Sequence, residues 1–406
     1  MYTLHTHCRA CGFAKPGAPS IKANSTDKLI EVMDLGIQPL ANDFVKEGEP
    51  RAGYAPLKVL FCPRCTLAQL SVVVDPQVLY SHYSYVTSPS ETMREHFKNL
   101  ITNISRETNG MKVLEIGSND GRLLKMMKEG GGYEVLGVDP ALNLSVIAEC
   151  QGVPTKTGFF GSDLAMDLGQ YDIVIARHVL CHIDDWKDFV RGLELVSHLD
   201  TLICIESPYA VDTIRKCEFD TIYHEHLSYL TIKAVNALLA ETDLRLHEII
   251  RYSIHGGAVL LMLRHKDKAR LNDGIPEDIT ADAWRFFSAD AKEQITSLGE
   301  VVEQFRNEGK SVAALGASAK STVWISACGF SRKDIAFIAD NTPQKQWTFS
   351  PGTDIPVVDE GAIMRELPDY VVIFAWNYLE EILEKFADVR ARGVKFIVPI
   401  PTIQIL

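Results

Sequence analysis

The middle of the chain alternates short apolar runs with stretches of helical periodicity. Four runs have the length and composition of buried strands: residues 112–117, 134–139, 171–176 and 201–206. Residues 122–128 and 186–197 between them have helical periodicity, and a further helix is predicted over residues 91–106. This alternation predicts a parallel sheet that is covered by helices on both faces.

The same order of elements returns in the last third of the chain. A polar amphipathic stretch over residues 277–308 predicts a connecting helix, and four more apolar runs follow it: residues 311–316, 335–340, 370–375 and 394–398. In both halves the first strand ends in a glycine, and the second ends in an aspartate, Asp139 or Asp340. We therefore expect two related Rossmann-like α/β domains, with a small module before them that is rich in proline, glycine and cysteine.

Length and charge restrict the class of protein. With 406 residues the chain is too long for one ordinary hydrophobic core, which agrees with two or three domains. A formal net charge of −12 argues against nucleic acid as a partner. The chain has neither an apolar run of about eighteen residues nor the pattern of a signal peptide, so no membrane partner is expected. We expect a cytoplasmic protein that is a monomer or a weak homodimer.

Two cysteine pairs share the spacing Cys-x-x-Cys, namely Cys8 with Cys11 and Cys62 with Cys65. Two thiolates on one tight turn can both reach an ion about 2.3 Å away, and four thiolates complete a tetrahedron with no open position. The pattern favours a structural Zn²⁺ ion over an iron–sulfur site, a redox pair or unmetallated thiols. The interval between the pairs is longer than in the usual zinc ribbon.

A turn between the first strand and its helix has the residues expected of a cofactor site: Glu115, Gly117, Asn119, Asp120 and Gly121. The glycines let the backbone approach a ligand, whereas the two acids would repel a pyrophosphate and suit a sulfonium and an ammonium. Asp139 could accept hydrogen bonds from a ribose, and Phe160 could cover an adenine. The set favours S-adenosylmethionine (SAM) over a nicotinamide dinucleotide. The alternatives are a helix cap at Asp139 and a core position for Phe160.

A dense group of titratable side chains lies in residues 223–229, which include Tyr223, Glu225 and His226. His182 follows the third strand, at the edge of the sheet where ligands bind in such folds. Methylation of a carbon needs a carbanion equivalent, which a base and an enolate-stabilising donor can generate beside a ketone. Imidazole is a suitable base near neutral pH. Metal binding and purely structural histidines are the alternatives.

These motifs, in this order, resemble one family over essentially the whole chain, the sugar C-methyltransferases of deoxysugar biosynthesis. The segments that carry the resemblance are both cysteine pairs, residues 115–121, 223–229, 316–320 and 340–346, and Ala375-Trp376-Asn377-Tyr378. The resemblance implies a nucleoside-diphosphate 4-keto-deoxysugar as substrate. The family contains members that methylate C-3 and members that methylate C-5, so the ring position stays open.

The resemblance also implies roles for single residues. His226 would be the base at sugar C-3, Tyr223 would assist at the reacting centre, and Glu225 and His182 would support or stabilise the enolate. A segment with Tyr83, Tyr85, Ser88 and Ser90 would close over the sugar. The C-terminal domain would hold the nucleotide-sugar, and the residues that it offers are Lys320, Asn341, Lys345, Trp376 and Asn377. Residues 316–320 open a helix whose amides could meet a diphosphate, while Trp376 could equally be an ordinary packed aromatic.

The sequence therefore predicts an α/β protein with three parts: a zinc-binding module over residues 1–74, a SAM-binding methyltransferase domain over residues 75–272, and a C-terminal Rossmann-like domain over residues 273–406. Its predicted reaction is methyl transfer from SAM to a ring carbon, with C-3 favoured, of a nucleotide-linked 4-keto-6-deoxysugar. An NAD-dependent nucleotide-sugar oxidoreductase or epimerase is one alternative. A non-catalytic adaptor with a zinc module is another.

Overall fold

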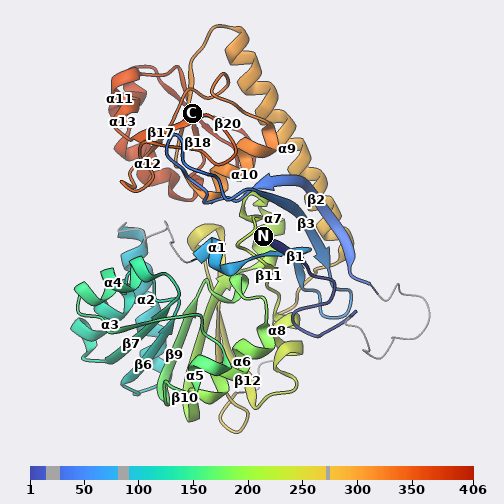
Figure 1. The fold of residues 1–406 in the computed structure, drawn as a ribbon, viewed down its shortest axis with the longest axis vertical. Helices are drawn as coiled ribbons and strands as arrows, with labels where there is room; N and C mark the ends of the chain where they lie inside the picture. The colour runs from blue at the N-terminus through green and yellow to red at the C-terminus, as the bar shows by residue number, and fades with distance from the viewer. Residues whose placement is uncertain (15–27, 81–90, 271–274) are drawn as a thin grey trace.

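The computed structural model describes residues 1–14, 28–80, 91–270 and 275–406. Figure 1 shows two α/β halves stacked along the longest axis, with the N-terminal strands beside their junction. The lower half contains a seven-stranded sheet in the order β12-β13-β10-β9-β6-β7-β8. The strands are β6 (Lys112–Ile116), β7 (Glu134–Asp139), β8 (Thr155–Thr157), β9 (Tyr171–Arg177), β10 (Ser197–Pro208), β12 (Leu244–Tyr252) and β13 (Ala258–His265).

Six of the seven strands run in the same direction, and β13 runs antiparallel to both of its neighbours, β12 and β10. In β9, Ile173 and Ile175 pack into the core on one face, whereas Val174 and Ala176 pack into the core on the other. Burial on both faces explains the continuous apolar run in the sequence. The larger helices of this half are α2 (Glu91–Glu107), α3 (Arg122–Gly131), α4 (Leu142–Cys150), α6 (Trp186–Leu195), α7 (Ala210–Arg215) and α8 (Ile232–Leu239).

The upper half has a second seven-stranded sheet in the order β16-β17-β15-β14-β18-β19-β20. Its central strands β17, β15, β14, β18 and β19 are parallel. The strands are β14 (Val312–Leu315), β15 (Ile338–Asp340), β16 (Thr348–Phe349), β17 (Pro356–Asp359), β18 (Tyr370–Ile373), β19 (Lys395–Val398) and β20 (Gln404–Ile405). The longer helices are α10 (Ala319–Cys328) and α12 (Leu379–Lys385), with the five-residue α11 (Ala362–Glu366) and α13 (Ala387–Ala391).

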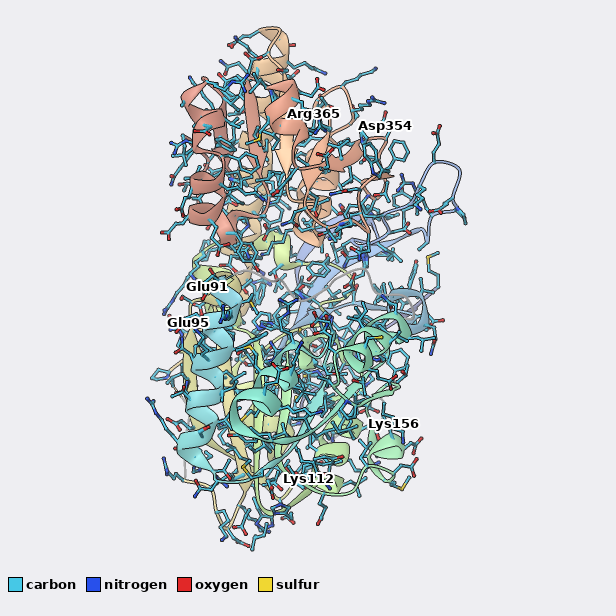
Figure 2. All side chains as sticks on the ribbon, turned by 90° about the vertical axis from the view of Figure 1, so that its left-hand side faces the viewer. Glu91, Glu95, Lys112, Lys156, Asp354 and Arg365 are labelled. Atoms are coloured by element: carbon cyan, nitrogen blue, oxygen red, sulfur yellow. The ribbon has the colours of Figure 1, made fainter. Side chains whose placement is uncertain are left out.

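Two connections join the halves. Helix α9 (Ala281–Asn307) runs beside both of them in Figure 1 and buries one apolar side that includes Trp284, Phe287 and Leu298. On the opposite side, Figure 2 shows Glu91 and Glu95 on the outward side of α2, near the upper half. At the start of this helix, Thr92 donates a hydrogen bond to Glu381 of α12.

The N-terminal strands form a small antiparallel sheet in the order β11-β4-β3-β2 and a pair between β1 and β5. Their bounds are β1 (Tyr2–Leu4), β2 (Ile30–Pro39), β3 (Tyr54–Phe61), β4 (Ala68–Leu70), β5 (Val72–Val74) and β11 (Ser228–Tyr229). Because β11 comes from the middle of the chain, the N-terminal module is built into the lower half. The division at residues 74 and 272 remains a prediction.

The predicted α/β fold is confirmed. Strands form in all eight predicted regions, and the expected helices over residues 91–106 and 277–308 correspond to α2 and α9. The antiparallel strands β12 and β13 and the pairing of β11 with β4 were not predicted. None of the helices that the structure describes is long and apolar enough to cross a membrane.

Candidate active site and zinc centre

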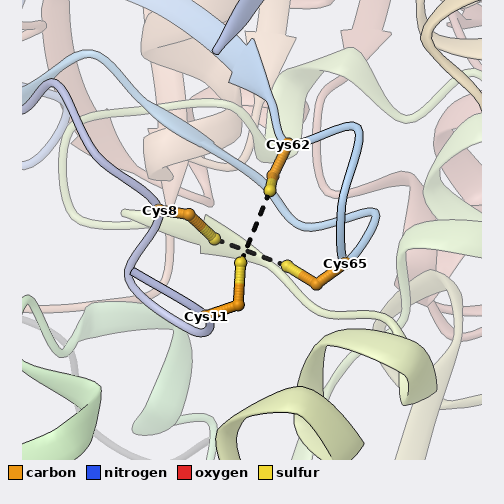
Figure 3. Close-up of side chains that lie close together, drawn as sticks. All are labelled: Cys8, Cys11, Cys62 and Cys65. Atoms are coloured by element: carbon orange, nitrogen blue, oxygen red, sulfur yellow. Dashed lines mark hydrogen bonds between the residues drawn. The ribbon is translucent and has the colours of Figure 1, made fainter. Parts of the chain in front are cut away.

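The four paired cysteines converge from two turns, as Figure 3 shows. Their sulfur atoms lie within 4.8 Å of one another, with 3.4 Å between Cys8 and Cys65 and 3.7 Å between Cys11 and Cys62. A tetrahedral ion with bonds of about 2.3 Å requires sulfur separations of about 3.8 Å. The four thiols therefore fit one Zn²⁺ ion with no position left for a substrate.

Both turns have the same backbone. The amide N–H groups of Gly12 and Thr66, one residue after each pair, donate to the carbonyls of Cys8 and Cys62 at 2.9 Å. Both residues have a left-handed conformation, with φ values of 67° and 64°. Arg9, within the first turn, is only 4% exposed and donates from Nη1 to the main-chain oxygen atoms of Leu70 and Leu227.

A cavity of about 1220 Å³ lies between the carboxyl ends of the two parallel sheets. Most of the predicted site residues line it: Gly117, Asn119, Asp139, Phe160, His182, Tyr223, His226, Lys320, Asn341, Lys345 and Asn377. Five others lie outside the lining formed by the described residues: Glu115, Asp120, Gly121, Glu225 and Trp376. Tyr83, Tyr85, Ser88 and Ser90 lie outside the part of the chain that the structure describes.

The turn after β6 has the shape required to hold an adenosyl group. Gly117 has a φ of 67°, and a Cβ atom there would lie 2.3 Å from Cγ2 of Val179. Asp139 at the end of β7 accepts the N–H groups of Asn119 and Ala141, which leaves lone pairs on both oxygens for ribose hydroxyls. Burial raises the pKa of Asp139. Phe160 lines the same cavity, so these residues fit the SAM cofactor.

The two other acids near this turn are paired with arginines. Glu115 is fully buried and accepts both Nε and Nη2 of Arg177 at 3.0 and 2.8 Å. Burial raises the pKa of Glu115 to about 7 against the opposing effect of Arg177. Asp120 lies 3.4 Å from Nη2 of Arg122. Because neither acid lines the cavity, its direct contact with a cationic cofactor remains a prediction from sequence.

The base predicted at His226 is held in one tautomer. Its Nδ1 lies 2.8 Å from the main-chain oxygen of Thr221, which can only accept, so Nδ1 carries the proton. The Nε2 atom is then unprotonated and accepts the hydroxyl of Tyr223 at 2.7 Å. Burial lowers the pKa of His226 well below its ordinary value, and His182 nearby lowers it further. The ring is therefore a neutral base at pH 7.

His182 lies beside His226, with ring centres 5.1 Å apart. Its Nδ1 donates to the main-chain oxygen of Glu225 at 2.8 Å, and burial lowers its pKa to about 4. The Glu225 carboxylate accepts Nδ2 of Asn42 at 2.6 Å and belongs to the wall behind the cavity. Cys181, His182 and His226 each place one potential ligand atom within 4.8 Å of the others, and burial raises the pKa of Cys181 to about 12.

Two lysines lie in the upper wall of the cavity, the part of its lining that the upper half provides. Lys320, in the first turn of α10, pairs with Asp220 at 3.1 Å. Asp220 also accepts the indole N–H groups of Trp324 and Trp376 at 3.1 and 2.7 Å. Lys345 donates to the Ala317 carbonyl at 2.7 Å, and burial lowers its pKa. Trp376 therefore lies behind Lys320 rather than in the cavity.

Several site residues have no signal in the sequence. Thr221 acts through its main-chain carbonyl, and Asp220 contacts partners about a hundred residues away. His178 lines the cavity in a left-handed conformation with a φ of 52° and lies 3.0 Å from Glu206. Burial opposes ionisation of Glu206, but hydrogen bonds from His178 and His96 hold its pKa well below its usual range. Residues 176–178 look like the end of an ordinary strand, so the sequence did not indicate that His178 pairs with the buried Glu206.

Three family models match successive parts of the chain. Residues 24–80 match "Putative zinc binding domain", residues 90–249 match "Methyltransferase domain", and residues 253–401 match "C-methyltransferase C-terminal domain". With the four-thiolate site and the cofactor turn, these matches define a SAM-dependent methyltransferase that carries a structural Zn²⁺ ion.

C-methyltransferase NovU from Streptomyces niveus is 31% identical to this chain over 413 residues, which cover 97% of this chain and 95% of that protein. The chain therefore belongs to the SAM-dependent C-methyltransferase family. This membership supports a methyltransferase over an NAD-dependent oxidoreductase or a non-catalytic adaptor.

Two solved structures match part of the chain at low identity. Magnesium protoporphyrin IX methyltransferase from Synechocystis PCC 6803, with bound SAM, is 14% identical over 43% of this chain and 79% of that chain, with a TM-score of 0.34. The PH0226 protein from Pyrococcus horikoshii OT3 is 14% identical over 47% of this chain and 96% of that chain, with a TM-score of 0.35.

Proposed function

We propose that this enzyme methylates a ring carbon, with C-3 favoured, of a nucleoside-diphosphate-linked 4-keto-6-deoxysugar in the biosynthesis of a branched deoxysugar. The observation that carries the proposal is the neutral His226, which has an unprotonated Nε2 and lines a cavity between the two Rossmann-like halves. A base beside a cavity of this size suits a substrate that has an acidic C–H bond and is linked to a nucleotide. As the sequence predicts, the reaction would take place in the cytoplasm.

In the proposed reaction, Nε2 of His226 takes the proton from the ring carbon next to the ketone, and the C–H electrons move toward the ketone oxygen. Bound SAM supplies an electrophilic methyl group. The enolate carbon forms the new bond to this methyl as the bond from sulfur to methyl breaks, which leaves S-adenosylhomocysteine. The ketone is restored. Enclosing both reactants in one cavity supplies the orientation that this displacement requires.

Tyr223 suits the stabilisation of the enolate. Its hydroxyl donates to Nε2 of His226 in the free enzyme, and it must turn away from this nitrogen before Nε2 can take a proton from the substrate. The hydroxyl can then donate to the enolate oxygen. Burial raises the pKa of Tyr223 well above its ordinary value, so the hydroxyl remains a donor throughout.

His182 and Glu225 are better suited to positioning than to proton transfer. With Nδ1 of His182 bound to a carbonyl and a pKa of about 4, its free Nε2 accepts rather than donates. Glu225 holds Asn42, and its carbonyl orients His182. Both would fix the shape of the pocket around the sugar.

The upper wall would hold the diphosphate. The first amides of α10 and the Lys320 ammonium converge at one end of the cavity, and Lys345 is a second cation in its wall. A helix N-terminus with a lysine is a suitable anion site even in a chain with a net charge of −12. Asn341 and Asn377 offer amides to the rest of the nucleotide-sugar.

The test is incubation with SAM and a panel of nucleoside-diphosphate 4-keto-6-deoxysugars. Mass spectrometry should detect one methyl gained in place of a hydrogen, and NMR should place it at C-3. In D₂O with S-adenosylhomocysteine, the enzyme should exchange the proton of that carbon without methylating it. Methylation of an oxygen, or no exchange at any carbon next to the ketone, would contradict the proposal.

A further inference from the structure

Glu218 is a buried carboxyl group that the proposed reaction does not use. It lies on the turn between α7 and the short helix η2 (Phe219–Thr221), lines the cavity, and is only 3% exposed. Among the residues that the structure describes, its Oε1 atom has no hydrogen-bond partner. Leaving such an atom unpaired is costly, so its retention beside a cavity indicates a ligand group that completes it.

The main chain around Glu218 holds the carboxyl group in place. Its N–H donates to the Thr213 carbonyl at 3.0 Å, and its carbonyl accepts the N–H of Thr221 at 3.2 Å. Gly256 provides the space for the side chain, because a Cβ atom there would lie 2.4 Å from Oε1 and 2.5 Å from Oε2. The same turn carries Thr221, the residue that fixes the tautomer of His226.

Among the described residues, the charges around Glu218 provide no ion pair of its own. Lys320 and Lys216 favour its ionised form, and Asp220 and Asp212 oppose it. Lys320 is bound to Asp220, and Lys216 donates to the Gly256 carbonyl. Burial is the largest effect and raises the pKa of Glu218 to about 7.

We infer that Glu218 accepts a hydrogen bond from a hydroxyl or amino group on the ring of the methyl acceptor and so selects acceptors that carry this group. The identity of the acceptor class rests on the proposed function. At neutral pH a diphosphate and a ketone can only accept hydrogen bonds, so neither can donate one to the Glu218 carboxylate. The cofactor turn, with Gly117 and Asp139, belongs to other strands. A site that is built for a hydroxyl discriminates strongly against an analogue that lacks it, because the protein group is then left unpaired.

The first experiment measures binding rather than turnover. Full-length enzyme saturated with S-adenosylhomocysteine is titrated by calorimetry with thymidine diphosphate hexoses that each lack one ring hydroxyl, and with one that carries an amino group instead. A uridine diphosphate set is measured in parallel. The wild type should bind one deoxy analogue about 10–10²-fold more weakly than its parent, the usual effect of losing a hydrogen bond to a charged group. Glu218→Leu should remove this preference, and Glu218→Gln, which keeps one accepting oxygen, should retain part of it.

A second measurement distinguishes this role from a structural one. In the free enzyme Glu218→Leu should raise the melting temperature, and more so at pH 8 than at pH 5.5. The raised pKa of Glu218 lowers stability progressively as the pH rises from 4.5, the ordinary value, to about 7, and the full effect is present above that. Affinity for S-adenosylhomocysteine should not change. Glu300→Leu, on the exposed side of α9, is the surface control.

Equal affinity of the wild type for all hexoses, absence of binding of any of them, or a preference that survives in Glu218→Leu would overturn the inference. So would a lower melting temperature or a loss of cofactor binding in this variant. If no sugar gains a methyl but the preference disappears in Glu218→Leu, the proposed chemistry fails while the assignment of Glu218 stands.

Discussion

Arg9 and Leu227 connect the zinc centre to the segment that carries the base. The guanidinium Nη1 of Arg9 donates to the main-chain oxygen of Leu227 at 3.2 Å, and Leu227 directly follows His226. The next two residues form β11, which pairs with β4 of the N-terminal sheet. His224 lies 3.1 Å from the Ala55 carbonyl of the same sheet. The zinc-bearing module therefore holds both sides of the segment that carries the proposed base.

We expect Arg9→Met to lower kcat while the enzyme still binds zinc and S-adenosylhomocysteine. A displacement of the base by about 1 Å can cost about 10²-fold in rate. The measurements are steady-state kinetics, zinc content and calorimetry. Arg64→Met is the matched control, because Arg64 lies in the other cysteine turn but is exposed. Wild-type kcat in Arg9→Met would show that the contact does not position His226.

Removal of zinc should unfold the N-terminal module. In the part of the chain that the structure describes, no other potential ligand joins the four thiols, so without the ion they lose the bonds that hold the two turns together. Cys11→Ser should lower the zinc content and the melting temperature together, whereas Cys150→Ser, at an exposed cysteine, should change neither. A chelated enzyme with an unchanged melting temperature would contradict a structural role for the metal.

His226→Asn should lower kcat by about 10²–10⁴-fold, the usual contribution of a general base. Asparagine can still donate to the Thr221 carbonyl, so the fold and the affinity for S-adenosylhomocysteine should persist. Exchange of the ring proton in D₂O should be lost in parallel with methylation. His198→Asn, at a partly exposed ion pair with Asp172, is the control for general effects of replacing a histidine. Near-normal turnover in His226→Asn would refute the assignment of the base.

The two cavity histidines should make the fold less stable in mild acid. Burial lowers the pKa of His182 to about 4, whereas a histidine in the unfolded chain titrates near pH 6.5. Between these values the unfolded chain binds a proton that the folded chain does not, so stability falls as the pH falls from about 6.5 to about 4. Urea unfolding at several pH values measures the slope, which should be smaller in His182→Gln.

The sequence predicted those elements whose signal is local. Strands β6, β7, β9 and β10 are buried on both faces and therefore appear as continuous apolar runs, and the Cys-x-x-Cys spacing fixes the zinc ligands almost alone. The two-residue strand β11 carries no periodicity, so its pairing with β4 could not be predicted.

The side-chain partners within the site could not be predicted without knowing how the strands pair. Glu115 and Arg177 lie on neighbouring strands, and only the pairing of β6 with β9 brings them together. A sequence shows two acids near a glycine turn but not that each is neutralised by an arginine. In the same way, the main-chain carbonyl of Thr221 determines which nitrogen of His226 is basic. Any residue at this position has such a carbonyl, so the sequence cannot reveal this role.

Asp220 makes the last connection that we propose to test. It is fully buried in the lower half and accepts hydrogen bonds from three side chains of the upper half, namely Lys320, Trp324 and Trp376. Asp220→Ala leaves these donors without their acceptor and leaves Lys320 without its counter-ion. Loss of one partner from a buried pair of this kind typically destabilises a fold by about 3–5 kcal/mol. Because Lys320 belongs to the proposed diphosphate site, the KM for the acceptor should also rise.

The affinity of Asp220→Ala for S-adenosylhomocysteine should stay unchanged, since the predicted cofactor residues Gly117, Asp139 and Phe160 belong to the lower half. Asp220→Asn keeps an oxygen that can accept from the indoles but loses the charge, so it should recover most of the stability and little of the acceptor affinity. Asp388→Ala, at an exposed position of α13, controls for the loss of a carboxylate. Asp220 is the ion-pair partner that aligns Lys320. An unchanged KM in Asp220→Ala would therefore contradict a role of Lys320 in binding the acceptor.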